Sequence, residues 1–136
     1  MIQVFCNKRG SGKTKNLINL ANEQLTEAKG DSVYIDDDNR HISQINRRIR
    51  FINTNEFNIT GYNEFYGLLC GIISENYDVE NIYIDGVFKI NSGTTKESSE
   101  WFKRIYKLTK QFEINIYMNI NYENQEIPDF IKEYVA

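Results

Sequence analysis

Residues 7–14 have the residue types and the spacing that bind a triphosphate. Gly10 and Gly12 let backbone N–H groups turn inward around phosphate oxygens, and the helical pattern that follows adds a positive helix end. Lys13 can reach the β- and γ-phosphates, and the hydroxyl of Thr14 can bind Mg²⁺. We therefore expect ATP or GTP to bind here with Mg²⁺. The residues of this expected nucleotide site are Asn7, Lys8, Arg9, Gly10, Ser11, Gly12, Lys13 and Thr14.

Asn7 departs from the usual form of such a phosphate-binding loop (P-loop), G-x-x-x-x-G-K-[ST], which begins with glycine. Asparagine is the residue other than glycine that best tolerates a positive φ angle, so the loop can still form. The alternative is a surface turn rich in glycine and serine before an ordinary helix. The apolar run before the segment and the helical pattern after it favour the phosphate-binding loop.

Asp85 is a second candidate for metal binding, because it ends the apolar run Asn81–Ile84. A carboxylate at the end of a buried strand can hold Mg²⁺ through water, opposite the hydroxyl of Thr14. The alternative is a turn residue that only ends the strand. The next residue, Gly86, has no side chain that could orient a water molecule for attack on a phosphate. If hydrolysis occurs, another acid must do this.

Candidates for that acid follow the apolar run Ser32–Ile35, which ends in Asp36, Asp37 and Asp38. The carboxyl ends of parallel strands form the edge of a sheet where ligands bind. Adjacent carboxylates repel one another and bind divalent cations or cationic partners, or they lie in water as a simple turn. Both interpretations are open for each of the three residues.

The elements that would position these residues alternate between strand and helix. Apolar runs typical of strands begin at Ile2 and cover Ser32–Ile35, Arg50–Asn53, Asn81–Asp85 and Ile114–Ile120. Such alternation predicts one α/β domain over residues 1–136, a three-layer sandwich around a mostly parallel sheet of four or five strands. Together with the loop at residues 7–14, this arrangement resembles the P-loop NTPase fold. The residues expected in the centre of its core are Val4, Ile35, Ile84 and Ile116.

Helical spacing of apolar residues appears between the expected strands. It runs from Leu17 to Ala28 with Gly30 as a stop, from Phe65 to Ile73, and from Trp101 to Phe112 after a capping box at Thr94. Gly67 and Gly71 suggest that the second of these helices packs closely against a neighbour. The polar and basic segment His41–Arg50 is also expected to be helical, Lys89–Thr95 to be a loop, and Pro128–Val135 to be a short terminal helix.

Composition limits the function classes. A formal charge of −3 over 136 residues argues against a protein that mainly wraps DNA, although it leaves contact with nucleic acid open. Cys6 and Cys70 do not have the spacing of metal ligands. We see neither a signal peptide nor an apolar run that could span a membrane, so we expect a cytosolic protein without membrane contact.

Together these features resemble the core of the RecA-like ATPases, a group of P-loop NTPases that includes recombinases and hexameric helicases. Tyr34–Asp38 is similar to the "FIDAE" strand of that group, whose acid activates water, and Ile84–Val87 is similar to its "VVDSV" string. Tyr117–Ile120 is similar to "FINQ", whose polar residues sense the γ-phosphate, but Ile120 replaces the glutamine. The resemblance covers most of residues 1–121.

This resemblance implies catalytic roles for Lys13 and Asp38, and Mg²⁺ binding by Thr14 and Asp85. Asn119 or, as a substitute, Asn121 would contact the nucleotide. RecA-like enzymes commonly complete the site with an arginine from the next subunit, which implies a homo-oligomer or a protein partner. Arginines that could serve are Arg40, Arg47, Arg48 and Arg50, and the alternative is a basic helix face in solvent.

The leading expectation is a minimal domain that binds ATP and hydrolyses it with Mg²⁺. One alternative is a nucleotide-binding regulatory module without useful turnover, which Asn7, Gly86 and Ile120 favour. The other is a small-molecule kinase acting on nucleosides. A weaker likeness to thymidine kinases supports it, through Asp38-Asn39-Arg40 in place of "DTR". The chain lacks the "DEAQF" string and the zinc-binding cysteines of those enzymes.

Overall fold

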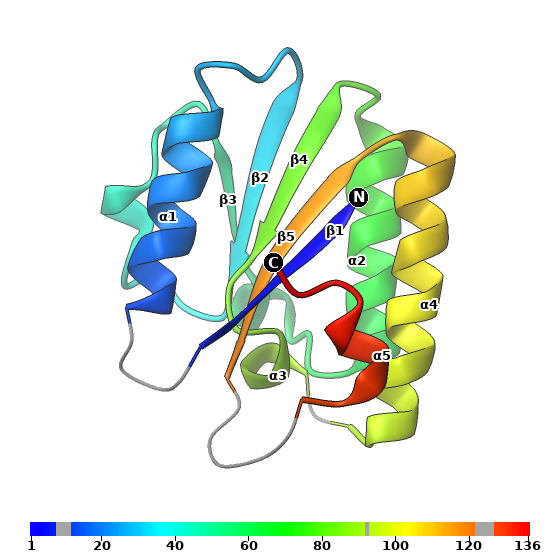
Figure 1. Cartoon of the computed structure of the whole chain (residues 1–136). Helices are drawn as coiled ribbons and strands as arrows, with labels where there is room; N and C mark the ends of the chain where they lie inside the picture. The colour runs from blue at the N-terminus through cyan, green and yellow to red at the C-terminus, as the bar shows by residue number, and fades with distance from the viewer. Residues whose placement is uncertain (8–11, 92, 122–126) are drawn as a thin grey trace.

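A five-stranded, all-parallel sheet organises the chain. The computed structural model describes residues 1–7, 12–91, 93–121 and 127–136 (Figure 1). In the sheet the strands follow the order β1-β5-β4-β2-β3. They are β1 (Ile2–Asn7), β2 (Asp31–Asp36), β3 (Arg50–Asn53), β4 (Val79–Ile84) and β5 (Asn115–Asn121). The expected α/β class and parallel sheet are confirmed, and the four residues expected at the centre of the core are fully buried.

Helices cover both faces of this sheet (Figure 1). They are α1 (Lys13–Gln24), α2 (Tyr62–Glu75), α3 (Val87–Ile90), α4 (Thr95–Phe112) and α5 (Asp129–Lys132). Apolar residues of α1 pack with segment 45–49 on one face, and those of α2 and α4 pack on the other. Right-handed crossovers explain this division, because the connection from β1 to β2 crosses the sheet in the opposite direction to those leading into β4 and β5.

The capping box of α4 is confirmed. The backbone N–H of Glu97 donates to Thr94 Oγ1 at 3.1 Å, and the Thr94 N–H donates back to the Glu97 carboxylate at 3.4 Å. The helix buries Trp101 and Ile105 as expected. Phe112 is 43% exposed instead, because it is the last residue of the helix and the chain turns at that point.

The expected helix over His41–Arg50 is wrong. The structure has a short 3₁₀ turn at Ile42–Gln44, followed by irregular turns. Side-chain amides hold the backbone there: Asn22 Oδ1 accepts from the Asn46 N–H at 2.9 Å, and Asn46 Oδ1 accepts from the Arg48 N–H at 2.9 Å. Such local bonds compete with helical ones, while two buried isoleucines of the segment still pack under α1.

Three other expectations need correction. The segment expected as the loop Lys89–Thr95 begins inside α3, a helical turn that buries Val87 and Ile90. The first helix ends at Gln24, and Gly30 is needed for another reason: a Cβ there would lie 2.2 Å from the Asp78 carbonyl oxygen. The close packing suggested for two glycines of α2 is absent from the described structure, since a Cβ on either would meet nothing within 4 Å.

The C-terminal residues lie beside β1, on its outer edge. The Val4 N–H donates to the Tyr134 carbonyl at 2.7 Å, and the Ala136 N–H donates to the Val4 carbonyl at 3.0 Å. The terminal helix expected over Pro128–Val135 is shorter than predicted, because these backbone bonds draw the last residues alongside the strand. The edge of β1 is thereby covered.

Candidate functional site

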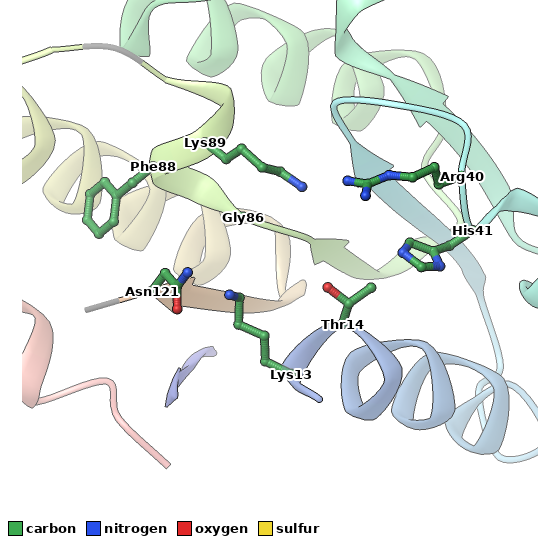
Figure 2. A pocket seen from close by; sticks show the side chains of 8 residues that line it. All are labelled: Lys13, Thr14, Arg40, His41, Gly86, Phe88, Lys89 and Asn121. Carbon is green, nitrogen blue, oxygen red and sulfur yellow. The ribbon is translucent and has the colours of Figure 1, made fainter. Parts of the chain in front are cut away.

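A polar cleft of about 580 Å³ lies at the carboxyl edge of the sheet (Figure 2). All strands are parallel, so the carboxyl ends of β2, β4 and β5 and the start of α1 meet at this edge. Among the described residues that line it, three are cationic and none is acidic. Such a lining suits an anionic ligand. The lining residues are Lys13, Thr14, Arg40, His41, Gly86, Phe88, Lys89 and Asn121.

The start of α1 supplies two of the expected site residues. Gly12 precedes the helix with a φ of 78°, a left-handed conformation that favours glycine. Lys13 and Thr14 form its first turn and line the cleft. Asn7 ends β1 and pairs in register with Asn121 of β5. The remaining expected nucleotide-binding residues, Lys8, Arg9, Gly10 and Ser11, lie outside the described residues.

Asp85 lies next to Thr14, although 71 residues separate them in the chain. The Thr14 hydroxyl donates to Asp85 Oδ1 at 3.3 Å, and the Tyr34 hydroxyl donates to Asp85 Oδ2 at 3.1 Å. The Asp85 side chain is buried, so these donors fix the direction of its carboxylate. Thr14 lines the cleft and Asp85 lies behind it, so a hydroxyl and a carboxylate, hard oxygen donors of the kind that Mg²⁺ prefers, lie side by side there.

Tyr34 was not singled out by sequence analysis. Burial, together with the nearby charge of Asp85, raises the pKa of Tyr34 above its usual value, so the phenol keeps its proton and donates. Its ring stacks between Phe51 and Tyr83 on the α1 face of the sheet. In the sequence Tyr34 is one of several apolar strand residues, and only the direction of its hydroxyl in the fold reveals its contact with Asp85.

Gly86 follows Asp85 and is the N-cap of α3, with a φ of 72°. A Cβ on this residue would lie 2.9 Å from Lys89 Cε. The backbone conformation at position 86 therefore requires glycine. A glutamate, which could orient a water molecule, would be strained here. The Gly86 N–H donates to Asn119 Oδ1.

Asn119 of β5, expected as a nucleotide contact, is fully buried, and its Oδ1 accepts that hydrogen bond from Gly86. Its Nδ2 atom has no hydrogen-bond partner among the described residues. It is not one of the residues that line the cleft, whereas Asn121, two residues further along β5, is. Ile120 between them is completely buried and cannot reach a ligand.

The three aspartates after β2 differ in environment, although their carboxylate oxygens lie within 4.8 Å of one another. Asp36 is 1% exposed, and burial followed by the charge of Asp85 raises its pKa to about 7, against the opposing effect of Lys89. The Lys89 ammonium lies 3.4 Å from Asp36 Oδ1 and 3.1 Å from Asp37 Oδ1. Lys89 is a site residue that sequence analysis missed, because one lysine in an expected loop carries no signal.

Asp38, the expected water-activating acid, is bound to Arg40. It accepts from the Arg40 backbone N–H at 3.0 Å and from its guanidinium Nε at 3.0 Å. Although burial opposes them, these bonds lower the pKa of Asp38 below its usual range. A low pKa makes a weak base, and Asp38 itself is not one of the described residues lining the cleft. Its role in activating water stays a prediction.

Arg40 is the only one of the four candidate arginines that lines the cleft. Arg50 begins β3, so it lies at the opposite, amino edge of the sheet. Arg47 and Arg48 are exposed in the segment between β2 and β3. The basic residues expected on one helix face therefore lie on the irregular segment between β2 and β3 and at the start of β3, not on one helix.

Comparison with known proteins gives no family assignment: no family model matches the chain, and no curated protein matches it. None of the helices in the described ranges has the length and apolar character needed to cross a membrane. The fold is a five-stranded parallel α/β sheet flanked by helices, with a cationic cleft at its carboxyl edge.

Proposed function

We propose that the protein is a small P-loop NTPase that binds ATP with Mg²⁺ in the cleft and hydrolyses it slowly. The observation that carries the proposal is the hydrogen bond between Thr14 and Asp85 at 3.3 Å. The loop motif and the strand motif each suggest a Mg²⁺ ligand independently, and those two residues come from distant parts of the chain. If residues 7–14 were only a surface turn before an ordinary helix, a contact between Thr14 and a buried aspartate at the end of β4 would not be expected.

Each residue has a distinct part in the proposed binding. The start of α1 offers backbone N–H groups and its positive dipole end to the phosphates, and Lys13 adds a charge at the β- and γ-phosphates. Thr14 and Asp85 would hold Mg²⁺, which supplies neutralisation of the charge that develops on the phosphates. Tyr34 would keep the Asp85 carboxylate directed at Thr14 through its 3.1 Å hydrogen bond to the other oxygen.

Binding is tested by calorimetry with ATP and Mg²⁺ on three proteins. We expect Lys13→Ala to lose affinity by about 100-fold or more, because it removes a charged contact to two phosphates. The matched control is Lys15→Ala, an exposed lysine of the same helix, which should bind like the wild type. Wild-type protein that gives no heat and no thermal shift with ATP or GTP would contradict the proposal.

A regulatory module without useful turnover is the second candidate function. The bond between Asp38 and Arg40 favours it, because it occupies the carboxylate that would have to activate water. Phosphate release by purified protein, with and without nucleic acid, separates the two functions. For an NTPase we expect slow release that Asp38→Asn lowers while ATP affinity barely changes. Release that stays at the buffer rate would favour the regulatory module.

A further inference from the structure

Lys89 gives the cleft a cation that neither sequence motif supplies. We propose that Lys89 binds the γ-phosphate of the bound triphosphate, leaving Asp36 and Asp37, so that a single chain distinguishes triphosphate from diphosphate. This inference rests on the proposed ATP binding above.

The position of Lys89 follows from the short helix α3. Gly86 turns the chain directly after Asp85, and the burial of Val87 and Ile90 fixes the helical turn against the core. Lys89 is thereby directed to the cleft, with its side chain 44% exposed. In the view of Figure 2, the side chains of Lys13 and Lys89 lie on opposite sides of the ribbon at Gly86, and both line the cleft.

The expected course of the triphosphate leads to Lys89. In the proposed binding, the N–H groups at the start of α1 would hold the β-phosphate, and Thr14 and Asp85 would hold Mg²⁺, which would offset the charge of the phosphates beyond it. The γ-phosphate therefore points toward the strand end at Asp85 and Gly86. Lys89 is the cationic side chain of the helical turn that begins there.

The two cations on this side of the cleft differ in how firmly they are held. Arg40 makes two 3.0 Å contacts to one carboxylate, through Nε and through a terminal guanidinium nitrogen. Both contacts are to the same oxygen, Asp38 Oδ2, and the Arg40 backbone N–H donates to the other oxygen at 3.0 Å, so three donors fix this pair. Lys89 makes single contacts of 3.1 and 3.4 Å to two different carboxylates through a flexible side chain. A change of rotamer is enough to exchange those carboxylates for a phosphate.

The electrostatics favour the exchange. Although burial lowers it, the charges of Asp36 and Asp37 raise the pKa of Lys89, which stays fully charged. A γ-phosphate offers that ammonium up to two negative charges and several acceptor oxygens.

The test compares the affinities of Mg-ADP and of a non-hydrolysable Mg-ATP analogue by calorimetry. We expect Lys89→Met to weaken binding of the analogue by about tenfold or more, the loss of one charge-assisted hydrogen bond, and to leave ADP affinity within about twofold. Lys89→Arg should restore most of the analogue affinity. The control Lys107→Met, an exposed lysine of α4, should behave like the wild type.

The outcomes separate this inference from the proposed function. Wild type that binds neither nucleotide refutes both. If the wild type binds both nucleotides, two results for Lys89→Met overturn the role of Lys89 and leave the nucleotide site in place. One is an equal loss of affinity for ADP and for the analogue, and the other is no loss for either. Retained ADP binding by Lys89→Met also shows that the variant is folded.

Discussion

At the scale of single residues, the site depends on a few polar side chains whose partners come from distant strands. Asp85 receives hydrogen bonds from the first turn of α1 and from the middle of β2. Asp36, the last residue of β2, lies at the same carboxyl edge of the sheet but forms its ion pair with Lys89. Two buried carboxylates with different partners can have different roles, and burial raises the pKa of Asp36 to about 7.

Asp85→Asn should remove most of the effect of Mg²⁺ on ATP affinity. The amide carries no charge to attract the cation, and groups that hold a metal through water typically contribute about 10–100-fold to its affinity. The measurement is the ratio of ATP affinities with Mg²⁺ and with a chelator, in variant and wild type. An unchanged ratio in a folded variant would mean that Asp85 only ends its strand.

At the scale of the elements, the strands and helices with regular apolar spacing could be predicted from the sequence, and the irregular segments could not. The five strands and the helices α1, α2 and α4 follow from apolar spacing, which long elements repeat several times. Segment 41–49 has two isoleucines four residues apart, a helical signal, but asparagine side chains from two segments hold its backbone in turns. Contacts of that kind, between residues far apart in sequence, leave no local pattern.

For the same reason, only some of the site residues could be predicted from the sequence. Thr14 and Asp85 each belong to a recognisable motif, and the strand order brings them together. Lys89 belongs to no motif, and Tyr34 appears only as the first residue of the strand string Tyr34–Asp38, with no role of its own. The contribution of each depends on where α3 starts or on which way a hydroxyl points. The binding of Asp38 by Arg40, two residues away, also had no signal in the sequence beyond their proximity.

Gly86→Ala should destabilise the fold, by about 1–2 kcal/mol, because its φ of 72° is costly for an L-residue with a side chain. The matched control is Gly67→Ala in α2, where a Cβ meets nothing within 4 Å and alanine improves helix propensity. It should stabilise by about 0.5–1 kcal/mol. Urea unfolding of both variants gives the comparison. Equal effects on the two would contradict a special conformation at Gly86.

At the scale of the whole molecule, the buried carboxyl of Asp36 should make stability depend on pH. Its pKa is about 7 in the folded chain, against an ordinary value of 3.8. Between these values the folded state binds more protons than the unfolded state, so stability falls as pH rises from about 4 to 7. Above about pH 7 this contribution is constant, and the buried charge is partly offset by Lys89.

Asp36→Asn should therefore be more stable than the wild type at pH 8 and differ little from it at pH 5. The neutral amide stands in for the protonated acid, and its oxygen can still accept the 2.7 Å bond from the Asp37 N–H. Thermal unfolding across this range, without Mg²⁺ or nucleotide, is the measurement, with the exposed Asp78→Asn as control. A wild-type advantage that grows with pH would reverse the expected sign.

The tryptophan of α4 makes these experiments practical. Trp101 is the single tryptophan of the chain, and it is 1% exposed among Tyr62, Phe65 and Phe102 on the α2–α4 face of the sheet. Its fluorescence emission should shift to the red when this packing is lost, and it should change little when a nucleotide occupies the cleft at the carboxyl edge. Emission from Trp101 thus reports folding alone, so a dye-labelled nucleotide in the same cuvette can report occupancy independently.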